Sequence, residues 1–195
     1  EDIWHTFNAA SRARAIIFEV PVDADGDQII GGSIASRTVA TGETLTIEIW
    51  NVDASGDPSS IATAGCTVDV TFSDTDDHTE KSFTFGTAHT VSAGDKLAIV
   101  VMSSSGWSSG DIDIKESGQP TPINNFPYEA TSTDGGSSWS GAGGTTNSVG
   151  IEFTGNRWYQ VGNALGYTDV QELSIDGTPA EAGLMFTSPC DMRVI

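Results

Sequence analysis

Strict alternation of side-chain character over residues 43–50 constrains the fold of this chain more than any other feature. From Thr44 onward, the odd-numbered positions carry large aliphatic side chains and the even-numbered positions carry polar or amphipathic ones: Leu45, Ile47 and Ile49 against Thr44, Thr46, Glu48 and Trp50. A period of two residues belongs to an extended strand with one buried face, because only there do successive side chains point to opposite sides. The segment therefore predicts a β-strand with one face on a core.

Short β-branched or aromatic runs recur along the chain, whereas helix signals are almost absent. Further strands are predicted over residues 14–20, 66–72, 81–85, 96–102, 111–115 and 148–153. Turn-forming clusters separate them at residues 24–27, 40–42, 54–58 and 92–95. The run 96–102 is apolar on both faces, which predicts a strand in the middle of a covered sheet. This spacing predicts an all-β fold, an antiparallel jelly-roll β-sandwich.

The charge balance excludes two classes of partner. Asp and Glu number 27 against 8 Lys and Arg, for a net charge of -19. Nucleic acids and anionic membranes need basic residues to displace their counterions, so we expect no nucleic-acid partner. No apolar run reaches the roughly 20 residues of a membrane span, so we expect no membrane insertion.

The two ends of the chain resemble each other. Residues 15–23 and 183–191 share three identities at a constant offset of 168 residues: Phe18, Pro21 and Asp23 match Phe186, Pro189 and Asp191. This offset fits a whole β-domain and is too long for a solenoid unit. We therefore predict a jelly-roll β-sandwich over residues 1–155. Residues 156–195 would form a linker and the opening strand of a second similar module, or an extension between subunits.

Four aromatic side chains stand in Gly- and Ser-rich surroundings: Trp107, Tyr128, Trp139 and Trp158. Two readings are open for them. Exposed rings could stack on sugar faces with nearby Asp or Asn as hydroxyl partners, which predicts a glycan-binding site. Alternatively, the rings plug the ends of the sandwich and hold a long loop in place.

An acidic turn is a candidate cation site. Asp23, Asp25 and Asp27 alternate around Gly26, and spaced carboxylates with backbone carbonyls can bind Ca²⁺. The turn is no EF-hand, because Gln-Ile-Ile-Gly-Gly follows where that loop needs a bidentate Glu. The alternative is a polar hairpin turn with solvated carboxylates.

Motifs for catalysis are weak. Residues 106–110 match the Gly-x-Ser-x-Gly elbow of serine hydrolases, but a strand pattern follows where that elbow needs a helix. His5, His78 and His89 show no metal-binding spacing. We therefore expect no enzyme activity. Two cysteines cannot form a disulfide framework, and whether Cys66 and Cys190 pair is left open.

Three segments in order carry a resemblance to a known group of proteins. These are residues 40–50, residues 91–101, and Tyr128 followed by the Ser-Thr-Asp-Gly-Gly-Ser-Ser-Trp run at 132–139. Together they resemble the jelly-roll, carbohydrate-binding-like modules of bacteriophage tail, fibre and head-decoration proteins and of some bacterial surface proteins. The resemblance implies a jelly roll that serves as virion structure, as an adhesin or as a sugar-binding appendage.

From these features we predict a non-catalytic structural module of a virion surface or an extracellular fibre. Its partners would be copies of itself or other virion or fibre subunits. The alternative is a carbohydrate-binding adhesin module that uses the loop aromatics on a cell-surface glycan. Either function would place the chain on a virion surface or outside the cell.

Overall fold

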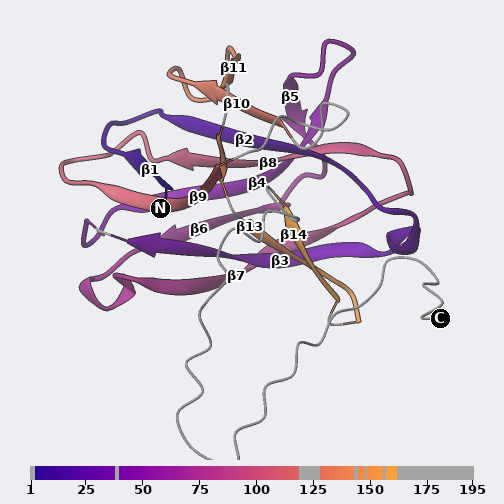
Figure 1. The fold of residues 1–195 in the computed structure, drawn as a ribbon, viewed down its shortest axis with the longest axis horizontal. Coiled ribbons are helices and arrows are strands. Elements are labelled where there is room, and N and C mark those ends of the chain that lie inside the picture. Colours follow the sequence, from indigo (N-terminus) through magenta and orange to yellow (C-terminus); the bar gives the residue numbers. More distant parts are fainter. Residues whose placement is uncertain are drawn as a thin grey trace, which may run out of the picture.

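Two antiparallel β-sheets pack face to face in the computed structural model of the chain (Figure 1). The structure describes residues 3–37, 40–118, 128–142, 145–147, 149–155 and 157–161, and in some of these, Tyr128 and Trp158 among them, only the backbone. Within this part of the chain no helix is long and apolar enough to cross a membrane. The predicted all-β sandwich is confirmed.

Eight strands form the jelly roll. Sheet A has the order β1 (Ile3–Phe7), β9 (Ile112–Gly118), β3 (Gln28–Arg37) and β7 (Thr79–Thr90). Sheet B has the order β2 (Ala13–Glu19), β8 (Lys96–Ser103), β4 (Thr44–Val52) and β6 (Thr67–Thr71). Successive strands cross from one sheet to the other, except that β4 and β6 are neighbours in sheet B. This crossing pattern, in two four-stranded sheets, is that of a jelly roll.

Short elements complete the connections. The 3₁₀ turn η1 (Val22–Ala24) joins β2 to β3, and η2 (Asp74–Asp76) joins β6 to β7. Strand β5 (Pro58–Ile61) lies between β4 and β6 in the chain and pairs with the end of β4.

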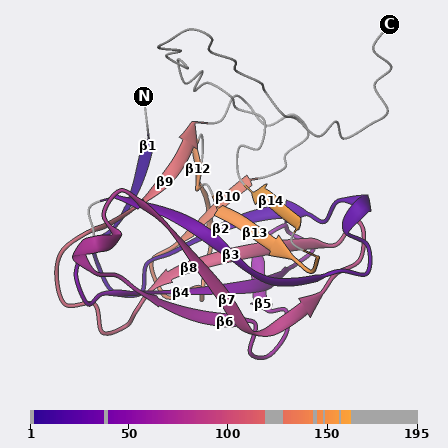
Figure 2. The same ribbon diagram turned by 90° about the horizontal axis from the view of Figure 1, so that it is seen from below.

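The chain after β9 adds strands to both sheets. In sheet B, β10 (Tyr128–Ser132) pairs with the outer edge of β2 and forms a hairpin with β11 (Ser140–Ala142). In sheet A, β12 (Thr145–Asn147) pairs with β9, while β13 (Val149–Phe153) pairs with β3 and β14 (Arg157–Val161) with β13 (Figure 2). Residues 157–161, which lie in the segment 156–195 predicted as a linker and the start of a second module, thus form a strand of sheet A. The suspected second module at 183–191 lies outside the described residues.

The core between the sheets follows the alternation in the sequence. Leu45, Ile47 and Ile49 are fully buried, and the intervening side chains of β4 are half-exposed on the outer face. Strand β8 lies between β2 and β4, and its residues 97–101 are buried on both faces, as predicted. Burial of each large aliphatic side chain stabilises the fold by about 1.5–3 kcal/mol.

A Gly pair allows β3 to lie between two other backbones. A Cβ on Gly31 would stand 2.2 Å from the Phe83 carbonyl oxygen, and one on Gly32 would stand 2.1 Å from that of Gly150. The pairing of β3 with β7 also shifts register between Ile29 and Gly31. The close approach of β7 and β13 therefore requires glycine at both positions.

Candidate functional site

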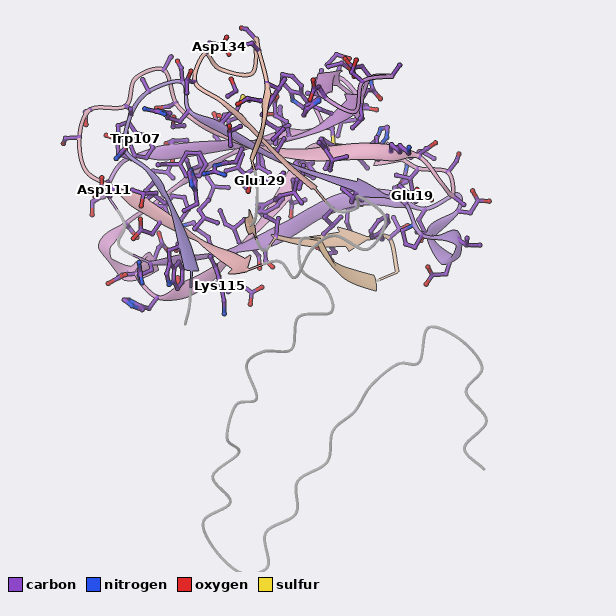
Figure 3. The ribbon with its side chains drawn as sticks, turned by 45° about the horizontal axis from the view of Figure 1, so that its top comes forward. Glu19, Trp107, Asp111, Lys115, Glu129 and Asp134 are labelled. Atoms are coloured by element: carbon purple, nitrogen blue, oxygen red, sulfur yellow. The ribbon has the colours of Figure 1, made fainter. Side chains whose placement is uncertain are left out.

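Trp107 holds the loop between β8 and β9 against the main core. Its ring is half-buried and packs on the residues between the sheets. Its Nε1–H donates a hydrogen bond to the Gly110 carbonyl oxygen at 3.2 Å, which closes the loop on itself. Figure 3 shows Trp107 at one end of the sandwich.

Glu43 fixes the same loop from β4's side. Its Oε1 accepts hydrogen bonds from Ser108 N–H at 2.8 Å, Ser108 Oγ–H at 2.5 Å and Ser109 N–H at 3.2 Å. The Ser108 hydroxyl bond is the main cause that lowers the pKa of Glu43, helped by the backbone N–H bonds. Strand β9 follows this loop, so Ser108 stands between two strands and its hydroxyl donates to a carboxylate. The arrangement holds a turn and does not match a strand–helix nucleophile elbow.

Trp139 ends the turn of the β10–β11 hairpin, which stands at the top of Figure 1. Its ring meets Trp50 of β4 edge to face, with centroids 6.0 Å apart and an interplanar angle of 81°. Gly135 N–H donates to the Ser11 carbonyl oxygen at 2.9 Å, which ties the turn to the start of β2. The hairpin turn therefore lies over the outer face of sheet B.

A second apolar cluster explains this position. Six residues of β2, β8 and β10 are buried on the outer face of sheet B: Ala13, Ala15, Ile17, Ala98, Val100 and Ala130. Four of the six are alanines, whose small side chains leave room for large rings above the sheet. Trp50, Val52, Met102 and Trp139 pack on them and are half-exposed. The result is an apolar surface that includes two indoles.

The N–H groups of the two indoles differ in their partners. Trp50 Nε1–H donates to Glu48 Oε2 at 2.6 Å, while Trp139 Nε1 is buried and has no hydrogen-bond partner among the described residues. An apolar ring surface with a polar edge is the arrangement that protein sites use for sugar rings and for aromatic ligands. A buried donor without an acceptor is uncommon in folded proteins.

Asp134 shapes the hairpin turn. Its Oδ1 accepts from Ser132 Oγ–H at 2.7 Å and Ser138 N–H at 2.9 Å, and its Oδ2 accepts from Ser138 Oγ–H at 2.6 Å. These bonds, the Ser138 hydroxyl first, lower the pKa of Asp134 to about 2 although the carboxylate is exposed. The segment 132–139 of the resemblance is thus a closed polar turn that presents Trp139 to the sheet.

The structure places two of the four predicted glycan-binding aromatics, and they lie in different surroundings. Trp107 belongs to the main core and Trp139 to the outer cluster on sheet B, so these two rings do not meet. The side chains of Tyr128 and Trp158 lie outside the described part of the chain; their backbones belong to β10 and β14. Trp50, which was not among the predicted residues, contacts Trp139 instead. The alternation over residues 43–50 places Trp50 on the outer face of its strand, and this was the sequence signal that could have identified it.

The acidic turn folds as η1 and the residues after it. Asp23 and Asp25 are exposed, and Asp25 Oδ1 accepts a hydrogen bond from Ala93 N–H at 2.9 Å. Gly26 adopts a φ of +79°, which favours glycine. In the described residues no group of three or more His, Cys, Asp or Glu side chains is arranged to hold a metal ion. Calcium binding by Asp23, Asp25 and Asp27 is therefore still a prediction.

The sequence did not predict a charged cluster that lies inside the sandwich. Arg14 of β2 binds the carboxylate of Glu129 on β10, with 2.8 Å between Nη1 and Oε1, and its Nε–H donates to His5 Nε2 of β1 at 3.0 Å. The Glu129 side chain is fully buried. Burial, with the nearby Arg14 and Arg12 charges, lowers the pKa of His5 to about 3. The cluster joins β10 to two strands, β1 and β2, that lie far from it in sequence.

Cys66 lies in the main core, and within the described part of the chain it forms no disulfide. Burial raises the pKa of this thiol to about 11. Cys190 lies outside the described residues, so the pairing of the two cysteines stays open.

Comparison with known proteins found no match among protein-family models, curated proteins or solved structures. The resemblance to phage and surface-protein modules is therefore an expectation that rests on the three segments alone.

Proposed function

We propose that this chain is a non-catalytic structural module of a virion surface or an extracellular fibre, and that it assembles with copies of itself. The observation that carries the proposal is how the loops are held. Side chains that could perform chemistry are used to fix loop shape: Glu43 with Ser108, and Asp134 with Ser132 and Ser138. Loops of fixed shape on a rigid sandwich suit a module whose task is to present surfaces to neighbours.

The location of the three segments with the resemblance supports the same proposal. Residues 40–50 lead into and form most of β4, residues 91–101 lead into and form most of β8, and residues 132–139 form the turn between β10 and β11. All three belong to sheet B, whose order is β11-β10-β2-β8-β4-β5. A motif set that is scattered in sequence thus comes together on one layer of the jelly roll.

The test is the assembly state of the purified 195-residue chain. Sedimentation velocity over a wide range of concentration, together with negative-stain electron microscopy, is expected to show oligomers or filaments. A chain that stays monomeric at every concentration and forms no particles would contradict the proposal.

A carbohydrate-binding adhesin module is the second candidate, and the Trp50–Trp139 surface favours it. Two indoles at 6.0 Å on the outer face of sheet B, beside Glu48, offer ring contact and hydroxyl recognition together. A glycan array is expected to show binding that Trp139→Ala removes and that Trp107→Ala, in the separate core cluster, retains. Binding that depends on Trp107 and not on Trp139 would contradict this location.

A further inference from the structure

Two carboxylates stand beside the paired indoles on the outer face of sheet B. Glu48 and Trp50 are two residues apart on β4, so their side chains share one face of the strand. Thr46, the next residue on that face, donates its hydroxyl to Asp69 Oδ1 of β6 at 2.7 Å. We call Glu48, Trp50, Asp69 and Trp139 the indole–carboxylate surface.

No basic side chain of the described residues neutralises these two carboxylates. Glu48 accepts a hydrogen bond from the Trp50 indole N–H at 2.6 Å, and Asp69 accepts one from the Thr46 hydroxyl. Both donors are neutral, and the ion pairs of the described chain involve other carboxylates. Glu48 is half-buried and Asp69 is exposed. The surface therefore carries two negative charges without a cation of its own.

The basic residues nearest in the fold lie away from this surface. In the described strands of sheet B they are Arg14 and Lys96. Arg14, together with Arg12 before β2, contributes to the charged cluster between the sheets. Lys96 lies opposite Glu19, and its position along the sheet is four residues, about 13 Å, from that of Glu48. Charges at that distance are largely screened at physiological ionic strength.

This combination suits a ligand that has both a ring and a positive charge. The face of an indole attracts a cation that lies within about 6 Å of the ring centroid. A carboxylate at the edge of the ring adds an acceptor for a charge-assisted hydrogen bond. An acidic ligand would be repelled by the two carboxylates and by the net charge of -19.

We propose that the indole–carboxylate surface binds an amino sugar through its protonated amine. The proposal rests on the carbohydrate-binding function, the second candidate above, and names the class of sugar. The sugar ring would contact the indoles, and its ammonium group would donate to Glu48 while Asp69 adds to the attraction. A glycan supplies a ring for the indoles as well as the charge, which a lysine side chain does not.

Isothermal titration calorimetry with three trisaccharides tests the proposal. The probes are triglucosamine, its N-acetylated form and trigalacturonate, which carry positive, neutral and negative sugars. Triglucosamine should bind more than about tenfold more tightly than its N-acetylated form, and trigalacturonate should not bind. Added salt should weaken the binding of triglucosamine and leave that of the N-acetylated form nearly unchanged.

Charge-removing variants locate the contact. Glu48→Gln keeps an acceptor for the Trp50 N–H, so it should lower the affinity for triglucosamine about tenfold and leave that for the N-acetylated form unchanged. Asp69→Asn should act in the same direction, and its exposed site keeps the test valid if Glu48→Gln fails to fold. Asp111→Asn, at an exposed site before β9 of sheet A, is the matched control and should alter either affinity by less than about twofold.

A trilysine peptide separates an amino sugar from a simple cation. The peptide carries three positive charges and no sugar ring, so it should bind more weakly than triglucosamine. Trp139→Ala should abolish the binding of triglucosamine and leave the weak binding of trilysine unchanged. Equal affinities of the wild type for the two probes would overturn the proposal and assign the surface to cations in general.

The remaining outcomes separate this inference from the function on which it rests. Equal affinity for triglucosamine and its N-acetylated form would overturn the inference and leave carbohydrate binding standing. Equal losses in Glu48→Gln and Asp111→Asn would also overturn it, because the attraction would then follow from net charge alone. A wild-type chain that binds none of the glycans would overturn the inference and the carbohydrate-binding function together.

Discussion

Arg14 and Glu129 form an ion pair across two neighbouring strands inside the sandwich, with 2.8 Å between Nη1 and Oε1. Arg14 is 17% exposed and Glu129 is fully buried. Strand β10, which carries Glu129, is an addition to the eight-stranded jelly roll and pairs only with β2 and β11 among the described strands. The ion pair therefore attaches the added hairpin to the jelly roll through a side-chain bond beside the backbone ladder.

Removal of one partner of this pair should destabilise the fold strongly. Glu129→Leu leaves the Arg14 charge without its carboxylate and is expected to reduce the free energy of unfolding by about 3–5 kcal/mol. Urea denaturation measures this loss. Glu19→Leu, on the exposed end of β2, is the control and should change stability by less than about 0.5 kcal/mol. Equal effects of the two substitutions would show that the pair contributes nothing.

Stability should fall with acidification from about pH 6.5. The pKa of His5 is about 3 in the folded protein, below its ordinary value of 6.5, so between these values the unfolded chain binds the proton and the folded chain does not. The free energy of unfolding then decreases as pH falls, by at most about 1.4 kcal/mol per pH unit from this residue. Burial also lowers the pKa of His89, which acts in the same direction.

The His5 contribution can be isolated with His5→Asn. This variant lacks the titrating group, so its unfolding free energy should vary less between pH 6 and pH 4 than that of the wild type. Urea denaturation at several pH values measures both curves. Parallel curves would assign the acid sensitivity to other groups, such as Asp76, whose pKa is lowered chiefly by its Lys81 bond.

The two outer indoles should be energetically coupled. Trp50→Ala and Trp139→Ala each remove half of an edge-to-face pair, so the double variant should lose less than the sum of the single losses. The expected coupling is about 0.5–1.5 kcal/mol. A thermodynamic cycle of urea denaturation measures it, and Trp107 with Trp139 is the control pair, since these rings lie in separate clusters. Strictly additive losses for Trp50 and Trp139 would contradict the contact.

Loss of the Asp134 carboxylate should loosen the hairpin turn without unfolding the sandwich. Asp134→Ala removes the acceptor of three hydrogen bonds from Ser132 and Ser138. Hydrogen exchange at the Ser138 amide should accelerate, while amides of β8 stay protected. Asp134→Asn keeps one side-chain oxygen and should show an intermediate rate. Uniform exchange rates in all three proteins would show that the carboxylate does not fix the turn.

Calcium is expected to stabilise the fold if Asp23, Asp25 and Asp27 bind it. At a hundredfold excess over the dissociation constant the gain is about 2.7 kcal/mol, which a thermal melt detects readily. Chelator should reverse the gain, and Asp23→Asn with Asp27→Asn should abolish it. Equal melting temperatures with calcium and with chelator would leave the polar hairpin turn as the interpretation.

Local sequence patterns predicted two kinds of strand: strands with one apolar and one polar face, and strands with two apolar faces. Strands β4 and β8 are of these kinds, and they lie where residues 43–50 and 96–102 indicate. Strand β3 was not predicted, because its Gly31–Gly32 pair interrupts the pattern. Glycine is needed at both positions because the backbones of β7 and β13 lie close to β3, and both strands are far from β3 in sequence.

In the candidate sites, too, local sequence patterns predicted some features, whereas others depend on residues distant in sequence. The alternation at 43–50 places Trp50 on the outer face, but its contact with Trp139 depends on the β10–β11 hairpin, which lies in a segment with no strand pattern. Likewise, nothing near Arg14 in the sequence indicates that Glu129 neutralises it. Contacts between residues far apart in the chain follow from the jelly-roll topology and not from local propensity.

Buried Cys66 offers an intrinsic probe of how often the sandwich opens. With a thiol pKa of about 11, only about one molecule in ten thousand carries the reactive thiolate at pH 7, and the core shields even that one. Alkylation of this thiol therefore requires transient exposure of the core. The rate at which a thiol reagent modifies Cys66 would report opening events under native conditions, without denaturant and without an engineered label.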